Sequence, residues 1–95
     1  MPTNRRSLTP RRHAVFELAA GLLLVFKPQG HREAEHRHPY GQRLRVVRGA
    51  LRVDTTKRSV VLRANSRPLT VVARRLHATR ALHDTWLVVE RIQRS

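Results

Sequence analysis

The chain has 95 residues, a net charge of +14 and no cysteine. This length suffices for one domain with a single core, leaves no room for a separate substrate domain, and makes burial of further surface in an oligomer favourable. The absence of cysteine excludes disulfides, thiolate metal ligands, iron–sulfur clusters and a cysteine nucleophile, and it fits a reducing, cytoplasmic location.

The positive charge is carried by eighteen arginines and only two lysines. Residues 1–12 contain four of these arginines and two prolines, with little that can pack, so we expect a flexible basic arm before a single domain at 13–95. Beyond the arm the arginines mostly occur singly at alternating positions, which is typical of a solvated face rather than of a dense basic patch.

An apolar run follows the arm from Ala14 to Phe26, with Glu17 inside it. It is shorter than the roughly 20 apolar residues that cross a bilayer, so we interpret it as core, with Phe16 and Phe26 buried. Residues 14–20 have helical propensity, whereas "LLLVF" at 22–26, bounded by glycine and proline, predicts a buried strand.

The remainder of the chain alternates short apolar runs with turn residues. The runs "RLRVV", "ALRV", "SVVL", "LTVVA" and "TWLVVERI" are rich in valine and leucine, and turn signals separate them at short intervals. This pattern predicts an all-β fold, either a sandwich or a small barrel, with little helix.

Alternation along these strands sorts the side chains onto two faces. If the side chain of His36 points inward, that of His38 does too. Likewise, if the side chain of Gln42 points inward, those of Leu44 and Val46 also point inward. The arginines between these positions then face solvent. Two histidines at i and i+2 on a strand can bind one ion, because imidazole suits zinc, copper, iron and nickel, and also manganese when oxygen ligands are added.

The spacing of one glycine pair, two histidines and a glutamine, from Gly30 to Gly49, resembles the first signature of the cupin family. That signature reads glycine, five residues, histidine, one residue, histidine, three or four residues, glutamate, six residues, glycine. The matching positions are Gly30, His36, His38, Gln42 and Gly49, with glutamine in place of the glutamate. More narrowly, "HRHPYGQRL" resembles a cupin branch in which glutamine is regular and which includes manganese-dependent hydroxynitrile lyases and decarboxylase-like proteins. The resemblance implies a small antiparallel β-barrel, the cupin jelly roll.

The second cupin signature supplies one more histidine, which we place at His77, with His83 as the reserve candidate. Ser66, Val72, Arg74 and Ala81 then stand where the family has glycine, proline, glycine and asparagine. The implied metal site consists of His36, His38, Gln42 and His77.

The resemblance also implies function. A divalent ion (manganese, iron, nickel or zinc, with manganese or iron favoured) is expected in the barrel of a homodimer. It would act on a small-molecule substrate, by lyase, decarboxylase or isomerase chemistry or as a dioxygenase. The chain has no marked serine nucleophile, no catalytic carboxylate pair and no glycine-rich phosphate loop, so the metal would make it an enzyme.

Two alternatives remain at this stage. One is a cupin with a degenerate, non-catalytic site. The other is a nucleic-acid-binding module in which the basic arm follows a phosphate backbone, although the aromatic content of 4% is low for base stacking.

Several further residues have expected places. We expect His31 to be exposed, and Glu33 and Glu35 to pair with arginines on the surface. Tyr40 lines the mouth of the pocket or caps the barrel end, and Trp86 belongs to the core or a subunit interface.

Overall fold

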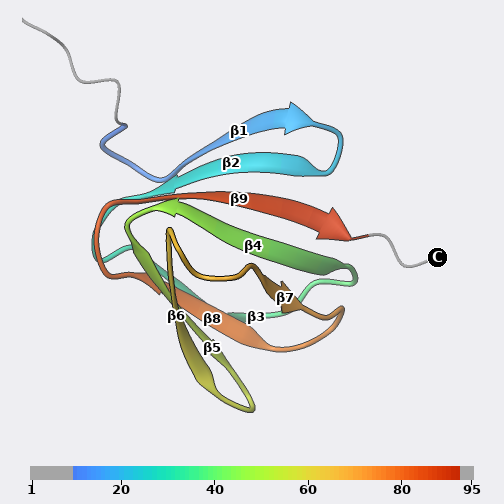
Figure 1. Cartoon of the computed structure of the whole chain (residues 1–95). Coiled ribbons are helices and arrows are strands. Elements are labelled where there is room, and N and C mark those ends of the chain that lie inside the picture. The colour runs from blue at the N-terminus through green and yellow to red at the C-terminus, as the bar shows by residue number, and fades with distance from the viewer. Residues whose placement is uncertain (1–9, 93–95) are drawn as a thin grey trace, which may run out of the picture.

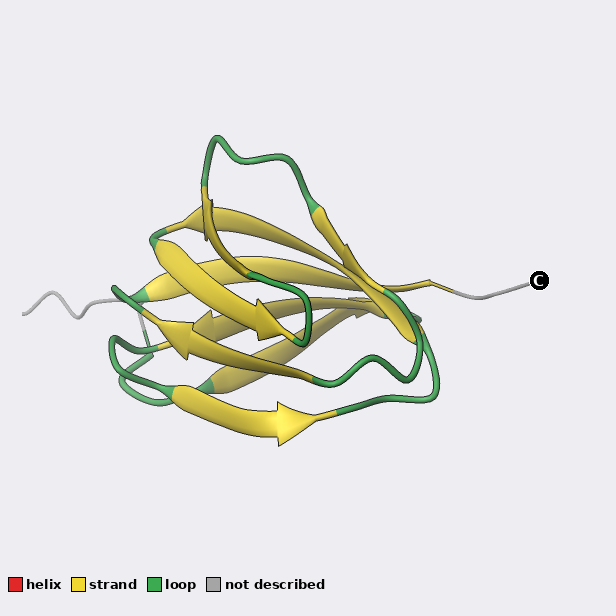
Figure 2. Ribbon diagram, turned by 90° about the horizontal axis from the view of Figure 1, so that it is seen from below, coloured by secondary structure: helices red, strands yellow, loops and turns green. Residues whose placement is uncertain are grey.

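The structure is a computed structural model that describes residues 10–92. Nine antiparallel strands form two sheets, and these residues contain no helix (Figure 2). In this part of the chain there is accordingly no helical segment with the length and hydrophobicity to span a membrane. The strands are β1 (Ala14–Ala19), β2 (Leu22–Lys27), β3 (Arg32–His36), β4 (Gly41–Arg48), β5 (Ala50–Thr55), β6 (Ser59–Arg63), β7 (Leu69–Val71), β8 (His77–Ala81) and β9 (Thr85–Ile92).

The two sheets face each other as layers (Figure 1). One sheet has the order β1-β2-β9-β4-β7, and the other has the order β3-β8-β5-β6. Strands distant in sequence are therefore neighbours, as β2 and β9 are along their whole length. The all-β fold expected from the sequence is confirmed. Of the predicted basic arm, residues 1–9 lie outside the described residues, and Arg11 and Arg12 are exposed.

The segment with helical propensity is instead strand β1, because it pairs with β2 from Ala14↔Phe26 to Ala19↔Leu22. Pairing with a neighbouring strand outweighs the small differences in local propensity. The expectation that Phe16 is buried is wrong: its side chain is 45% exposed. It stands on the outer face of the sheet and stacks on Trp86, with 6.2 Å between ring centroids.

The core lies between the sheets and is built from alternate residues of the strands. On β4, Leu44 and Val46 are buried while Arg43 and Arg45 are exposed, which confirms the predicted alternation. The core cluster consists of Val25, Leu44, Val46, Leu51, Val53, Leu62, Val71, Leu87 and Val89.

The junction between β4 and β5 requires glycine. Gly49 has a φ of +100°, and a Cβ atom there would lie 2.7 Å from Oγ1 and 2.8 Å from Cα of Thr85. The backbones approach closely because the Thr85 hydroxyl donates to the Ala50 carbonyl and accepts from the Ala50 N–H. This is the last glycine of the pattern noted in the sequence, and it fixes the register where the chain crosses between sheets.

Candidate metal centre

Three histidines come together at one end of the space between the sheets. His36 ends β3, His38 lies in the loop that follows, and His77 begins β8 directly opposite His36 in the register. Ring centroids are 4.3 Å apart for His36 and His77, 4.8 Å for His36 and His38, and 5.4 Å for His38 and His77. We call these three residues the histidine cluster.

The cluster is compact enough to share one ion. One ring nitrogen of each histidine lies within 4.8 Å of those of the other two. Three points no farther apart than that lie within about 2.8 Å of a common centre, whereas metal–nitrogen bonds are about 2.0–2.2 Å long. Ring movements of about 0.6–0.8 Å would therefore complete the coordination.

Hydrogen bonds fix the tautomer of two of these rings. The Nδ1–H of His36 donates to the carbonyl oxygen of Ala34 at 2.6 Å, and that of His77 donates to the carbonyl oxygen of Arg75 at 3.0 Å. A carbonyl can only accept, so the proton of each neutral ring is on Nδ1 and the lone pair is on Nε2. Histidines that bind metals in proteins are typically held in this way.

A bulge in β3 aims His36. Glu33 pairs with Thr79 and His36 with His77, so β3 has one more residue than β8 over this stretch. Ala34 and Glu35 both face outward as a result. Bulges of this kind re-aim side chains next to functional sites.

The turn before β8 has a residue with positive φ that is not glycine. Arg74 stands where the second cupin signature has glycine, and it has a φ of +66°. Its N–H donates to the carbonyl oxygen of His38 at 2.7 Å, which ties the two histidine-bearing segments together. His77 is only 3% exposed and points inward, whereas the reserve candidate His83 is exposed.

The histidine cluster opens into a cavity of about 180 Å³ between the sheets. Gln42, the fourth sequence-predicted ligand, lines the same cavity from β4, so all four predicted residues face one space. The walls beyond them are mainly aliphatic: Val15, Leu23, Val25, Leu44, Leu51, Leu87 and Val89.

Burial favours the neutral form of His38. Its pKa is lowered, first by burial and then by the neighbouring rings of His36 and His77. Tyr40 stacks on His38 with ring centroids 5.0 Å apart, and the guanidinium of Arg91 lies 4.1 Å from the centre of the tyrosine ring. Tyr40 thus lies beside the histidine cluster, where it lines a neighbouring hollow and not the cavity itself.

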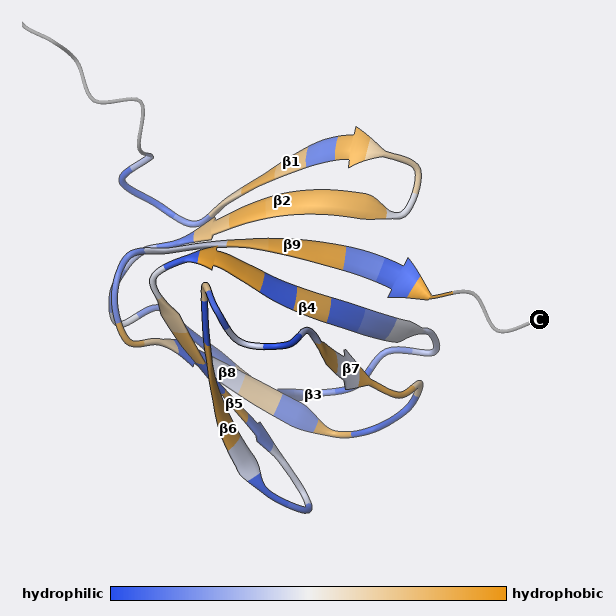
Figure 3. Cartoon of the chain, viewed as in Figure 1, coloured by the Kyte–Doolittle hydropathy of each residue, from blue (hydrophilic) through white to orange (hydrophobic). Residues whose placement is uncertain are grey.

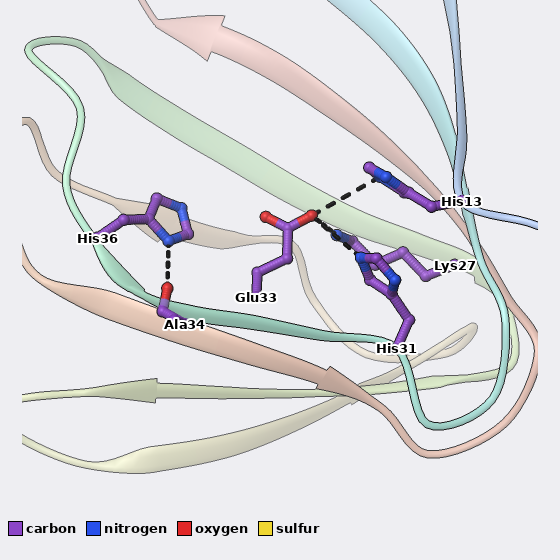
Figure 4. A network of polar contacts seen from close by, with 6 residues as sticks. All are labelled: His13, Lys27, His31, Glu33, Ala34 and His36. Atoms are coloured by element: carbon purple, nitrogen blue, oxygen red, sulfur yellow. Dashed lines mark hydrogen bonds and ion pairs between the residues drawn. The ribbon is translucent and has the colours of Figure 1, made fainter.

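The sequence-based placement of Glu33 is wrong. It does not pair with a surface arginine, because the bulge turns it into the cavity (Figure 4). Its Oε2 accepts a hydrogen bond of 2.7 Å from Nζ of Lys27 and lies 3.4 Å from Nε2 of His31 and 3.6 Å from Nε2 of His13. His31, expected to be exposed, is instead partly buried and stacks on His13. We call these four residues the Glu33 network.

The Glu33 network is an ion-pair cluster rather than a second metal site. Burial by itself raises the pKa of Glu33, but the hydrogen bond and charge of Lys27 outweigh this and lower it to about 2. Lys27 is 6% exposed, and its ammonium group lies 2.7 Å from Oε2 of Glu33, so a cation held by His13, His31 and Glu33 would lie beside a buried positive charge. The network thus joins β1 and β2 of one sheet to β3 of the other.

Two inward residues were missed in the sequence. Lys27 shares the face of Leu23 and Val25 on β2, so alternation could have placed it inside. Thr79 also lines the cavity, two residues after His77 on the same face of β8.

No family model matches the chain, and neither does any curated protein. Solved structures do match. A cupin superfamily protein from Desulfitobacterium hafniense is 15% identical, with 98% of this chain and 95% of that chain covered and a TM-score of 0.76. This chain has the cupin fold.

Two further solved structures with this fold differ in what they do. Salicylate 1,2-dioxygenase from Pseudoaminobacter salicylatoxidans is 14% identical over 74% of this chain and 20% of that chain, with a TM-score of 0.67. Drosophila melanogaster CENP-C, solved bound to CAL1, is 15% identical over 81% and 68%, with a TM-score of 0.65. At these identities the likeness concerns the fold alone, so function has to be argued from the site.

Proposed function

We propose that the chain is a metal-binding protein in which His36, His38, His77 and Gln42 hold one divalent ion inside the barrel. The observation that carries this proposal is the histidine cluster, whose ring nitrogens lie within 4.8 Å of one another, together with the Nδ1–H bonds to backbone carbonyls that leave a lone pair on Nε2 of His36 and of His77. The burial that keeps His38 neutral supports the same role, because a metal binds only the neutral imidazole.

The donor set indicates the kind of chemistry. Three neutral imidazoles and an amide oxygen cancel none of the charge of a divalent ion, so the ion supplies a strong Lewis acid that attracts anionic ligands. Nitrogen and oxygen donors suit manganese and iron, which we favour, and also nickel and zinc. The Glu33 carboxylate does not offset this charge, since Lys27 is paired with it.

The residues around the proposed ion form a mainly apolar cavity. The mainly aliphatic walls suit a small apolar body beside the histidine cluster, while Arg91 and Tyr40 line a neighbouring hollow that shares Gln42 with this cavity. We therefore propose a small organic acid or carbonyl compound as substrate, in a lyase, decarboxylase, isomerase or dioxygenase reaction. The dioxygenase among the solved structures of this fold is compatible with the last of these.

Metal analysis of the purified protein tests the proposal. After expression in medium supplemented with manganese and iron, we expect about one divalent ion per chain, because the site has one centre. His36→Ala together with His38→Ala should abolish binding, whereas His83→Ala, which removes an exposed histidine, should not. A folded wild-type protein without metal, or a double variant that retains it, would contradict the proposal.

We further propose that two copies pair through the outer face of β1, β2 and β9, in the cytoplasm. These strands consist mainly of hydrophobic residues except at the C-terminal end of β9 (Figure 3), and Phe16 and Leu18 on β1 are 45% and 54% exposed. Exposed apolar patches on an edge strand are typical of subunit interfaces. Light scattering should give the mass of a dimer for the wild type and the mass of a monomer for the Phe16→Ser, Leu18→Ser variant. Equal masses for the two proteins would refute this pairing.

A non-catalytic role remains the alternative. The site would then bind metal or a small ligand without turnover, and a metal-loaded protein inert toward a panel of small organic acids would favour it. The nucleic-acid hypothesis depends on residues 1–12, and it predicts that their removal flattens the salt dependence of binding to DNA or RNA.

A further inference from the structure

The hydroxyl of Thr79 is buried in the cavity without a partner. Thr79 is 9% exposed, and among residues 10–92 no group forms a hydrogen bond with its Oγ1. Buried hydroxyls are almost always hydrogen-bonded in native proteins, so an unpartnered one calls for an explanation. Thr79 is one of the residues that line a space that a ligand can enter.

The Glu33 network stands beside this hydroxyl. Glu33 lies directly opposite Thr79 in the register of β3 and β8. In the described part of the chain, all three contacts of the Glu33 carboxylate go to Oε2, from Lys27, His31 and His13. Its Oε1 is therefore available as an acceptor. Because the charges of Lys27 and Glu33 cancel, this end of the cavity favours a neutral polar group over a second carboxylate.

The geometry sets the length of the ligand. His77 and Thr79 are two residues apart on one face of β8, which places their Cα atoms about 6.7 Å apart. Aliphatic side chains such as Leu51 and Leu87 line the cavity between the two polar ends. A cavity of about 150 Å³ accommodates benzene, so the 180 Å³ available here suits a ligand of about seven non-hydrogen atoms.

We propose that Thr79 and Glu33 bind a hydroxyl group at the far end of a small chelating ligand. The ligand's oxygens take the open positions on the ion at the histidine cluster, and its hydroxyl, two or three carbon atoms away, donates to Oε1 of Glu33 and accepts from Oγ1 of Thr79. This inference rests on the proposed metal centre. It narrows the ligand class to small hydroxylated acids or carbonyl compounds.

Two probes that differ by one hydroxyl test the inference. Both 2-hydroxybutyrate and 2,4-dihydroxybutyrate chelate through the carboxylate and the 2-hydroxyl, and only the second has a terminal hydroxyl. Their dissociation constants are measured on the manganese-loaded protein through the fall in water proton relaxation as each displaces metal-bound water. Each protein is described by the ratio of its own two constants, so a change in metal affinity cancels.

We expect the wild type to bind 2,4-dihydroxybutyrate about fivefold more tightly, as one net hydrogen bond of about 1 kcal/mol predicts. Thr79→Val keeps the shape of the side chain but removes its hydroxyl, and should lower the ratio, because only the hydrogen bond to Glu33 is left. Thr70→Val, the same change at an exposed position on β7, should keep the wild-type ratio.

Equal constants in the manganese-loaded wild type would mean that solvent satisfies Thr79, and would overturn the inference alone. An undiminished preference in Thr79→Val would overturn it too. A chain that takes up no manganese is recognised before any ligand is added; that result removes the metal centre and this inference with it.

Discussion

Replacing Arg74 by glycine should make the protein more stable. Arg74 has a left-handed backbone with a φ of +66°, a conformation that costs an L-residue about 1–2 kcal/mol. Glycine removes that cost but adds about 0.4–1 kcal/mol of unfolded-state entropy. The net gain should be about 0.5–1 kcal/mol, and Tm should rise by about 2–8 °C for a domain of this size.

Thermal and urea unfolding of four proteins measure this effect. Arg74→Ala removes the same positive charge and exposed side chain but keeps the unfavourable backbone, so it separates relief of charge repulsion from relief of strain. Arg75→Gly is the positional control. Arg75 is not among the described residues with positive φ, so glycine there should lower stability by about 0.5–1 kcal/mol. The reasoning is refuted if Arg74→Gly is no more stable than Arg74→Ala.

Three other outcomes are expected. Gly49→Ala should destabilise the protein by about 3 kcal/mol or prevent folding, because the added methyl would lie 2.7 Å from Oγ1 of Thr85 and the φ of residue 49 is positive. Urea unfolding measures the change in stability. A loss of stability below about 1 kcal/mol would contradict the structure. Gln42→Glu should tighten manganese binding by about tenfold or more in calorimetric titration, since a carboxylate adds a negative charge to the proposed ligand set; unchanged affinity would place residue 42 outside it. Glu33, with its pKa lowered to about 2, contributes stability that is present above its unfolded pKa of 4.5 and is lost as the pH falls toward 2. This contribution is about 1–2 kcal/mol after solvent screening. In Glu33→Gln, the free energy of unfolding should therefore fall less steeply between pH 4.5 and pH 2 than in the wild type. An unchanged pH dependence in this range would disprove the role of the Lys27–Glu33 pair.

The sequence by itself determined the strands rich in valine and leucine and the inward set on β4. Alternation depends only on the period of the extended backbone, so Leu44, Val46 and Gln42 fall on one face wherever the strand pairs. The spacing of His36 and His38 carried the resemblance to cupins, and the structure brings both rings to His77 as that resemblance implied.

Tertiary structure decided what depends on the partner strand. The bulge in β3 exists only in the pairing with β8, and it moves Glu33 from the surface into the cavity. Local sequence does not reveal that Phe16 lies on an outer face, since burial depends on what covers the strand. The positive φ of Arg74 likewise follows from its bond to the His38 carbonyl, a contact across 36 residues of chain that no local pattern contains.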